Sequence, residues 1–412
     1  MITRIQIQGF KSLKDVDLAL GDLNLFIGTN ASGKSNLFDA LRVLQGIGYG
    51  FTIEEILNGK PKSGTSEVWE GIRGGSGRAF FSGLQTETGD SGEHIIRLGV
   101  TIRTALLEGS LIEFSIGISP EGGCVREEKL SKDGSLVYDS SLVHNDPGTP
   151  GFKVAYRHGK KGTYPHKEFE KSRPVLHQIL RRKDTSKAHV EVIQQCIQAL
   201  SDTQRLDPIP AILRQYAQAQ AVRRMGEHGE NFAALIKTII ADEKMKSAYL
   251  SWLTQLTPME LDDIAVLEGA LKEPLFAIRE KGVDYPAPIL SDGTLRFAAI
   301  AGAFFQPDRP GLLAIEEIEN SIHPSRIRLL VELLKSQSKR SGQQVLATTH
   351  SPVILSWLKE DDFRTTFFCK RDEETGASHV VPLSKVPRFL EIVRRDSSIL
   401  DLFMEGWLEG AV

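Results

Sequence analysis

The sequence predicts an α/β protein in which a long insertion interrupts a parallel sheet. An apolar run at 23–27, typical of a buried parallel strand, is followed at once by a glycine-rich loop at 28–35 and then by a helical pattern. Two further short apolar runs, at 312–315 and 344–348, alternate with helical patterns, as strands of a parallel sheet do. Antiparallel-strand and helical patterns fill the chain between these two regions and form the insertion.

The other elements are predicted from their periodicity. Alternation with period two indicates strands, and apolar positions three and four residues apart indicate helices. The glycine-rich stretch 46–92 is expected to consist of loops around short elements. The predicted strands are 2–8, 16–27, 94–103, 111–118, a pair around 132–134, and 274–283, and the predicted helices are 36–44, 188–200, 231–256 and 295–305.

This order of elements predicts three segments. Residues 1–150 are expected to form an N-terminal lobe with an antiparallel β subdomain, 151–284 a basic and helical insertion or lid, and 285–412 a C-terminal lobe.

Composition excludes several classes of protein. Hydrophobic residues make up 41% and charged residues 25% of the chain, and no apolar run is long enough to span a bilayer. The N-terminal residues lack the basic and apolar regions of a secretory signal, so we expect a cytoplasmic protein without a membrane partner. Cys124, Cys196 and Cys369 lie too far apart for a metal knuckle and are expected to be reduced structural residues.

The loop at 28–35 reads GTNASGKS and fits the pattern GxxxxGK[ST] between a strand and a helix. The backbone N–H groups of such a loop wrap a phosphate chain, which favours glycine at Gly28 and Gly33. Lys34 supplies a cation between the β- and γ-phosphates, and the hydroxyl of Ser35 is a ligand for Mg²⁺. The positive end of the following helix adds to phosphate binding. These residues predict that ATP and Mg²⁺ bind here.

Two carboxylates, Glu316 and Glu317, end the apolar run 312–315. At the carboxyl end of a strand beside a phosphate loop, the first carboxylate can hold the Mg²⁺ shell and the second can orient the attacking water. Most such strands end in aspartate, and Glu316 is one methylene longer. The alternative interpretation is that both acids only cap the next helix.

A second candidate phosphate-binding segment, Ser291–Thr294, precedes the helix at 295–305. Serine and glycine at a helix N-terminus can form another nest of N–H groups. Because one chain has one γ-phosphate site, a second nest indicates a second molecule. An ordinary serine N-cap with a glycine turn is the alternative.

His350 follows the apolar run 344–348. A lone histidine is usually structural. A polar histidine at the carboxyl end of a strand in a phosphate site, however, can hydrogen-bond the γ-phosphate.

The net charge of −3 conceals a basic block at 153–187. It contains interleaved aromatic residues, and such a block can bind phosphodiester backbones. A solvated insertion kept soluble by its charges is the alternative. The basic residues are Lys153, Arg157, Lys160, Lys161, Lys167, Lys171, Arg173, Arg181, Arg182, Lys183 and Lys187, against Glu168, Glu170 and Asp184, and the aromatic residues are Phe152, Tyr156, Tyr164 and Phe169.

The motifs resemble a known family in their order. FKS at 10–12, GTNASGKS, LSDGTLR, LLAIEEIENSIHP and ATTHSP are similar to the ATP-binding-cassette (ABC) ATPase heads of the RecF, SMC and overcoming-lysogenisation-defect group, above all to stand-alone bacterial ATPases of the AAA_21 type. The resemblance covers 1–45 and 285–385, and 223–240 also looks like that subgroup. No Q-loop glutamine is assigned, and Ile318 stands where a proline is common.

The resemblance implies a role for each motif. Residues 28–36 would form Walker A, 291–294 the signature, Glu316 and Glu317 Walker B, 319–324 the D-loop, and His350 the switch histidine. The implied catalytic residues are Lys34, Glu317 and His350, and the implied Mg²⁺ ligands are Ser35 and Glu316. The implied ATP-contacting residues are Lys11, Gly28, Thr29, Asn30, Ala31, Ser32, Gly33, Lys34, Ser35, Asn36, Ser291, Asp292, Gly293 and Thr294.

The same resemblance implies an ATPase switch. Two chains, as a homodimer or within a larger assembly, would close around two Mg-ATP molecules, and hydrolysis to ADP and phosphate would release them. The group favours a sensor ATPase of an anti-phage or anti-plasmid defence system. Because residues 351–412 are too few for a nuclease domain of ordinary size, we expect the effector to be a separate protein.

Three other functions are compatible with parts of this pattern. A nucleotide-gated DNA clamp for repair or genome maintenance would use the basic block at 153–187. A small-molecule kinase is disfavoured by the second nest and by His350. A transporter subunit is disfavoured because residues 35–290 separate the Walker lysine from the signature, whereas transporter cassettes leave about a hundred.

Overall fold

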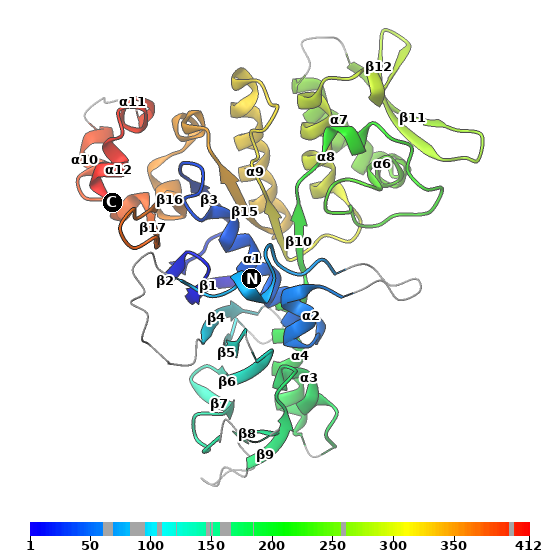
Figure 1. Ribbon diagram of the computed structural model, residues 1–412. Coiled ribbons are helices and arrows are strands. Elements are labelled where there is room, and N and C mark those ends of the chain that lie inside the picture. The colour runs from blue at the N-terminus through cyan, green and yellow to red at the C-terminus, as the bar shows by residue number, and fades with distance from the viewer. Residues whose placement is uncertain are drawn as a thin grey trace. The chain divides into compact units, whose positions relative to one another are not determined.

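The computed structural model describes residues 1–412 except 61–68, 83–94, 105–108, 121, 146–148, 150, 157–165, 184, 257–260 and 395–398 (Figure 1). The chain divides into two units, each drawn from separate stretches of sequence. Unit 1 comprises Met1–Gly21, Gly28–Thr203 and Phe368–Val381, and unit 2 comprises Asp22–Ile27, Gln204–Phe367 and Pro382–Val412. The three segments expected from the sequence remain a prediction.

Unit 1 is built on an eight-stranded antiparallel sheet. Its first strand alternates as expected for a sheet with one buried face, with Ile5 and Ile7 buried and Arg4 and Gln6 exposed. The strands lie in the order β2-β1-β4-β5-β6-β7-β8-β9. They are β1 Ile2–Phe10, β2 Leu13–Ala19, β4 Ile96–Arg103, β5 Leu111–Ser119, β6 Cys124–Lys132, β7 Ser135–Asp139, β8 Gly151–Tyr156 and β9 His166–Glu170.

Both predicted hairpins are confirmed. β4 pairs with β5, and β6 with β7, each antiparallel. Asp133 and Gly134 both have positive φ, as a two-residue type I′ turn requires.

The predicted strand 16–27 is wrong as a single element. β2 ends at Ala19 and pairs antiparallel with β1, whereas β3, Leu23–Ile27, pairs parallel with β15 in unit 2. The sequence contains two patterns: alternation up to Leu20 fits a half-exposed antiparallel strand, and the continuous run after Asp22 fits a buried parallel one.

The helices of unit 1 cover more chain than predicted. The expected helix at 36–44 is confirmed, but it begins at Lys34 and continues to Tyr49. Part of the expected loop region is a helix with a capping box in which Thr52 and Glu55 bond each other's backbone N–H groups, a T-x-x-E signal that the sequence contains. The helices are α1 Lys34–Tyr49, α2 Ile53–Asn58, α3 Val175–Leu180 and α4 Lys187–Ser201, with a 3₁₀ turn at Ser76–Arg78.

Unit 2 contains the predicted parallel strands. Its strand order is β10-β14-β15-β3-β16, in which β14, β15 and β3 are parallel neighbours, and β16 continues into unit 1 to pair with β17. All four residues of β14 and all six of β15 are buried. The strands are β10 Thr203–Leu206, β14 Leu312–Ile315, β15 Gln344–Thr349, β16 Thr366–Arg371 and β17 Ser378–Pro382.

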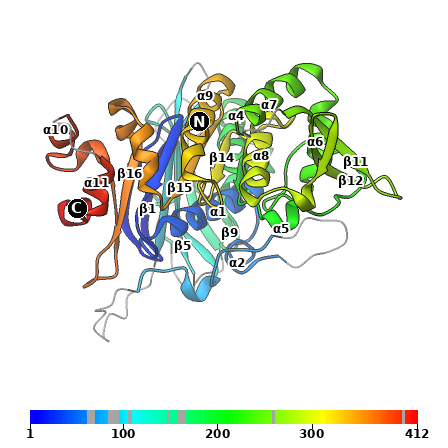
Figure 2. The ribbon, with the colours of Figure 1, turned by 90° about the horizontal axis from the view of Figure 1, so that it is seen from above.

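The rest of unit 2 is mainly helical. α6, α7 and α8 gather beside the hairpin of β11 and β12 in both views (Figures 1 and 2). The predicted helix 231–256 is two helices that break at 241–242, and β11 was not predicted. The helices are α5 Pro210–Leu213, α6 Phe232–Ile240, α7 Glu243–Leu256, α8 Asp292–Phe305, α9 Ile327–Ser341, α10 Phe389–Arg394, α11 Ile399–Met404 and α12 Trp407–Ala411. The three-stranded sheet is β11 Leu261–Glu268, β12 Pro274–Glu280 and β13 Val283–Pro286, and 3₁₀ turns lie at Ala287–Ile289, Pro324–Arg326, Pro352–Trp357, Glu360–Arg364 and Leu383–Lys385.

The cysteines are free and buried, as expected. Burial raises the pKa of the Cys369 thiol to about 12, which keeps it neutral and unreactive. Within the described ranges, no helix is both long and apolar enough to cross a bilayer.

Candidate nucleotide site

The sheet of unit 2 brings three strand ends together. β3, β14 and β15 are parallel neighbours, so their carboxyl ends lie along one edge of the sheet. In the sequence, Gly28 follows β3, Glu316 follows β14 and His350 follows β15. Ligands of open α/β sheets bind at this edge. The glycine-rich loop, the two carboxylates and His350 therefore each follow one of these strands in the sequence, whereas Lys11 and the signature segment do not.

The glycine-rich loop in unit 1 encloses the ammonium group of Lys34. Its Nζ donates to the carbonyl oxygens of Gly28 and Thr29, both at 2.7 Å, and to Ser32 Oγ at 3.2 Å. The lysine is only 5% exposed. The loop is thus folded around the cation that the sequence assigns to the phosphates.

Both predicted glycines are required by the geometry of the loop. Gly33 has φ of 99° and precedes α1 without a side-chain cap, which leaves the helix N-terminus to an anion. A Cβ on Gly33 would lie 2.1 Å from Ser378 Oγ, and one on Gly28 would lie 2.1 Å from the carbonyl oxygen of Cys369. Larger residues would displace the loop at either position.

Two serines that the motif does not include support the loop. Asn36 Nδ2 donates to Ser12 Oγ at 2.7 Å, and Ser12 Oγ lies 2.6 Å from Ser378 Oγ. The amide of Ser378 also donates to the carbonyl of Ser12 at 2.7 Å. Ser12 belongs to the FKS motif, but nothing in the sequence points to Ser378.

Lys11 is held by the side of α1. Its Nζ lies 2.5 Å from Asp39 Oδ2 and donates to the carbonyl of Arg73 at 2.7 Å. Arg73 also contacts Asp39 at 3.2 Å and donates to the carbonyl of Ser35 at 2.6 Å. This buried ion pair fixes Lys11 on the helix that follows the loop. Contact between Lys11 and ATP remains a prediction.

The two carboxylates after β14 have different surroundings. Glu316 is buried, and its Oε1 accepts a hydrogen bond from Arg205 Nη2. The side chain of Glu317 is 46% exposed, and its Oε1 lies 3.3 Å from His350 Nε2. Its other oxygen accepts from Asn320 Nδ2 at 3.1 Å, and its backbone has φ of 46°. The side chain of Glu316 is only 11% exposed, so Glu317 is the carboxylate that a water molecule can reach more readily.

Arg296 holds the backbone of Glu316 and Glu317 in place. This role was not predicted from the sequence. The side chain is buried, and its Nη2 donates to the carbonyls of Glu316 at 2.8 Å and Glu317 at 3.0 Å. Its Nη1 donates to Asp207 Oδ1 at 3.2 Å. A single cation inside the otherwise apolar helix 295–305 was the available signal, because a buried charge needs partners.

The signature segment caps α8. Ser291 Oγ accepts from the amide of Thr294 at 3.2 Å and lies 2.8 Å from Thr294 Oγ1. Ser291 is therefore the N-cap of α8, as the alternative interpretation of this segment predicted. Its side chain is also exposed to solvent. A Cβ on Gly293 would lie 2.5 Å from the carbonyl oxygen of Ser321, so the signature and the D-loop are in contact. Arg214 Nη2 donates to Asp292 Oδ1 at 2.5 Å.

The predicted Mg²⁺ ligands have suitable chemistry. Mg²⁺ prefers oxygen donors, keeps several waters and usually takes only one or two protein ligands beside the phosphates of its nucleotide. The hydroxyl of Ser35 and the carboxylate of Glu316 are oxygen donors of this kind, and Glu316 is ion-paired with Arg205. That the two residues bind one Mg²⁺ ion remains a prediction. Across the described residues, no group of three or more His, Cys, Asp or Glu side chains is placed to hold a metal ion.

Comparison with known proteins agrees with this fold. Residues 260–356 match the AAA_21 family, described as "AAA domain, putative AbiEii toxin, Type IV TA system", and residues 1–51 match the AAA_15 family, described as "AAA ATPase domain". A protein of Helicobacter pylori described as "ATP/GTP phosphatase" is 23% identical over 398 residues, which cover 93% of this chain and 95% of that protein.

Solved structures of SMC heads have the same fold. The SmcHead bound to the C-winged helix domain of ScpA aligns with a TM-score of 0.53 at 14% identity, covering 95% of this chain and 99% of that one. An Smc head with an extended coiled coil, bound to the C-terminal domain of ScpA derived from Pyrococcus furiosus, aligns with a TM-score of 0.50 at 12% identity and covers 95% and 99%. Two segments of the chain therefore match ATPase family models, the chain is similar over most of its length to a protein described as an ATP/GTP phosphatase, and it has the fold of SMC heads.

Proposed function

We propose that this protein hydrolyses ATP and acts as a switch in which two chains close around two Mg-ATP molecules. The contrast between the two carboxylates carries the proposal: Glu317 is half-exposed and paired with His350, whereas Glu316 is buried against Arg205. One carboxylate is thus available to a water molecule, and the other is fixed by a cation. This division of tasks is what hydrolysis of a phosphoanhydride requires.

Each residue then has a distinct task. Lys34 neutralises charge on the β- and γ-phosphates, and the N-terminus of α1 binds the phosphate chain. Ser35 and Glu316 would hold Mg²⁺, which would supply positive charge to the phosphates. Glu317 accepts a proton from the attacking water, and His350 orients Glu317 through Nε2. When nucleotide is bound, His350 can instead donate this N–H to the γ-phosphate.

The second chain supplies the signature. Ser291 is exposed and precedes α8, which begins with Asp292. In the proposal, the Ser291 hydroxyl and the backbone N–H groups at the start of α8 contact a nucleotide held by another molecule. A head-to-tail pair gives each ATP one Walker loop and one signature segment. The closed state then depends on ATP, and hydrolysis opens it.

We also propose that this switch acts in defence against phage or plasmids and controls a separate effector protein. The AAA_21 description mentions a toxin of a toxin–antitoxin system, which favours this pathway. The SMC heads of similar fold are bound to ScpA domains, so a head of this kind can work with a protein partner.

ATP turnover by the wild-type chain and by Lys34→Ala tests the proposal. We expect phosphate release from ATP by the wild type and neither ATP binding nor release by the variant, because the phosphates lose their cation. Lys129→Ala, a change at an exposed lysine of unit 1, is the matched control and should behave as wild type. Normal ATP affinity in Lys34→Ala would refute the assignment of the loop.

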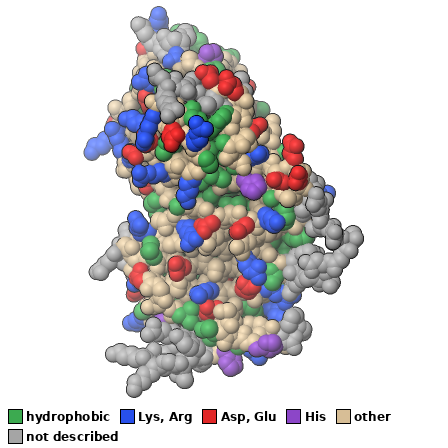
Figure 3. All heavy atoms as spheres, turned by 90° about the vertical axis from the view of Figure 1, so that its left-hand side faces the viewer, with side chains coloured by type: hydrophobic (Ala, Val, Ile, Leu, Met, Phe, Trp, Pro, Cys, Tyr) green, Lys and Arg blue, Asp and Glu red, His purple; other side chains and the backbone are tan. Residues whose placement is uncertain are grey.

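A nucleotide-gated DNA clamp is the second candidate, supported by the basic block at 153–187. The clamp would need aromatic side chains on which bases stack, but Phe152 and Phe169 of this block are buried in the fold. Their burial argues against this candidate. Arg157, Lys160, Lys161, Tyr164 and Asp184 lie outside the described residues. On the face drawn in Figure 3, Lys and Arg side chains are interspersed with Asp and Glu. Salt-dependent DNA binding by the chain alone would favour the clamp.

A further inference from the structure

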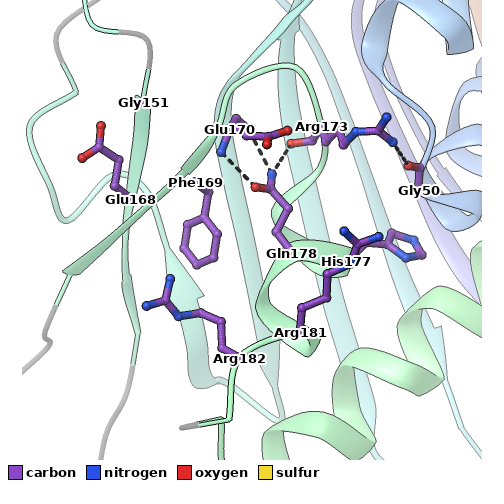
Figure 4. A pocket seen from close by; sticks show the side chains of 10 residues that line it. All are labelled: Gly50, Gly151, Glu168, Phe169, Glu170, Arg173, His177, Gln178, Arg181 and Arg182. Atoms are coloured by element: carbon purple, nitrogen blue, oxygen red, sulfur yellow. Dashed lines mark hydrogen bonds between the residues drawn. The ribbon is translucent and has the colours of Figure 1, made fainter.

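Unit 1 contains a cavity of about 770 Å³ that the nucleotide site does not use (Figure 4). Its walls come from β9, α3, the residues after α3, and the end of α1. The volume lies within the roughly 300–1,000 Å³ typical of small-molecule sites. The lining residues are Gly50, Gly151, Glu168, Phe169, Glu170, Arg173, His177, Gln178, Arg181 and Arg182.

The lining is polar and carries an excess of positive charge. Three arginines, Arg173, Arg181 and Arg182, line it together with two carboxylates, Glu168 and Glu170. The guanidinium of Arg182 lies 5.6 Å from the ring centre of Phe169, which supports it against the wall. Arginine forks match phosphate oxygens in pairs, so such a set favours a phosphate-bearing ligand.

The cavity is rigid where β9 meets α3. Gln178 Oε1 accepts from the amide of Glu170 at 2.9 Å, and its Nε2 donates to the carbonyls of Glu170 at 2.9 Å and Arg173 at 3.0 Å. The buried carboxylate of Glu128 holds the other side of this turn, because it accepts from the amides of Val175 and Leu176 at the start of α3. A site fixed before its ligand arrives loses little entropy on binding.

Two lining residues also hold the end of the Walker A helix. Arg173 Nη1 donates to the carbonyl of Gly50, the residue that ends α1, at 2.9 Å. His177 Nε2 lies 3.1 Å from the carbonyl of Ile47, one turn from that end. Burial lowers the pKa of His177, so the ring is neutral at pH 7 and donates through Nε2. The helix that begins at the phosphate loop therefore ends in the wall of this cavity.

We propose that this cavity binds a phosphate ester of nucleotide size through Arg173, Arg181 and Arg182, and that the bound ester alters ATP turnover by drawing Arg173 away from Gly50. The binding step stands on the cavity alone, whereas the effect on turnover rests on the proposed function. To the extent that the ester changes the affinity for ATP, ATP changes the affinity for the ester by the same factor, because binding at two linked sites is reciprocal.

Binding is tested with a fluorescent N-methylanthraniloyl derivative of AMP, in the presence of saturating non-hydrolysable ATP analogue to fill the Walker site. We expect saturable binding by the wild type and an affinity at least about tenfold weaker in the double variant Arg181→Glu/Arg182→Glu, which reverses the charge of the wall. Lys339→Glu/Arg340→Glu changes the net charge equally at exposed positions near the end of α9 and is the matched control. It should bind as wild type.

The competitors distinguish the source of the phosphate. Displacement of the probe by AMP but not by millimolar inorganic phosphate supports a nucleotide-sized ester. Equal displacement of the probe by inorganic phosphate would mean that the cavity binds free phosphate, which contradicts the proposal of a ligand of nucleotide size. A single-stranded oligonucleotide that binds with the same dependence on Arg181 and Arg182, while AMP does not, would make the cavity part of a nucleic-acid groove and overturn the proposal. Equal probe binding by the wild type and the double variant would also overturn it.

The link to α1 has a readout that does not need activity. The amides of Gly50 and Phe51 donate to the carbonyls of Ile47 and Gly46, so their hydrogen exchange reports the end of the helix. AMP should change exchange at these amides in the wild type and in Lys34→Ala alike, but not in the arginine double variant. Unchanged exchange with AMP bound would refute the coupling. If exchange changes and no ATP is hydrolysed in any condition, the cavity stands and the proposed ATPase fails.

Discussion

His350 Nε2 lies 3.3 Å from Glu317 Oε1, which joins the ends of two neighbouring parallel strands, β14 and β15, through their side chains. The adjacent Glu319 reinforces this link, because its Oε1 accepts from the amide of His350 at 2.6 Å and from that of Ser351 at 3.0 Å. A base oriented by a neighbouring residue, itself held by a third, is the usual arrangement of a catalytic proton acceptor.

Glu317→Gln should leave ATP binding intact and slow hydrolysis at least about a hundredfold, because the amide cannot accept the proton of the water. The ATP-bound variant should accumulate as a dimer, measured by sedimentation with ATP and Mg²⁺. Glu316→Gln is the matched comparison, because it removes the negative charge beside Arg205. In this variant we expect ATP hydrolysis to depend less on Mg²⁺, and we expect no accumulation of an ATP-bound dimer. Trapping by Glu316→Gln alone would reverse the two roles.

Ser291→Arg should bind ATP normally but neither dimerise nor hydrolyse it, because the Walker loop is in the same chain and the interface gains bulk and charge. Ser291→Ala loses only the cap on Thr294, worth roughly 1 kcal/mol, and is the control for helix fraying.

Mixing Ser291→Arg with Lys34→Ala tests whether the site is shared. A heterodimer of the two has one site with both defects and one with neither, so phosphate release should return. An inactive mixture of chains that do associate would mean that both sites must act together or that Ser291 serves its own chain's nucleotide. Full activity of Ser291→Arg alone would refute the shared site.

Gly33→Ala should abolish ATP binding and lower the thermal midpoint, because φ of 99° disfavours any Cβ and the added carbon would lie 2.1 Å from Ser378 Oγ. Gly77→Ala, where a Cβ meets nothing within 4 Å, is the control and should change neither property. A Gly33→Ala protein that binds ATP normally would show that the loop adapts at no cost.

Glu128 makes stability depend on pH. Its carboxyl is buried, and burial raises its pKa from 4.5 to about 7 in spite of hydrogen bonds from Tyr138, Val175 and Leu176. The folded state then binds the proton more tightly than the unfolded state, so this contribution is complete below about pH 4.5 and is lost as the pH rises through about 7.

The Glu128→Gln variant isolates that contribution. Between pH 5 and 8, the free energy of unfolding of the wild type should fall relative to that of the variant by up to about 3 kcal/mol, as measured by urea denaturation. Glu127→Gln, at the exposed neighbour, should follow the wild type at every pH. A constant difference between the wild type and Glu128→Gln would show that the carboxyl is ionised throughout.

Local pattern alone predicted the phosphate loop, the strands that carry the motifs and both antiparallel hairpins. Lys34 follows a glycine whose backbone conformation the motif itself requires, and β14 and β15 contain short apolar runs of the kind typical of buried parallel strands. Such features depend on neighbours in the chain, so the sequence contains them. The same local reasoning failed at 16–27, where two kinds of strand meet within a few residues.

Only the tertiary structure assigned partners to the charged side chains. Arg205 meets Glu316 from 111 residues away, and Arg296 reaches the backbone of Glu316 and Glu317 from the helix before them. The cavity brings together the end of α1 and residues more than a hundred positions further along. Periodicity reports which face of an element is buried, but the partner of a buried charge depends on which elements pack together. That choice is made by the fold as a whole.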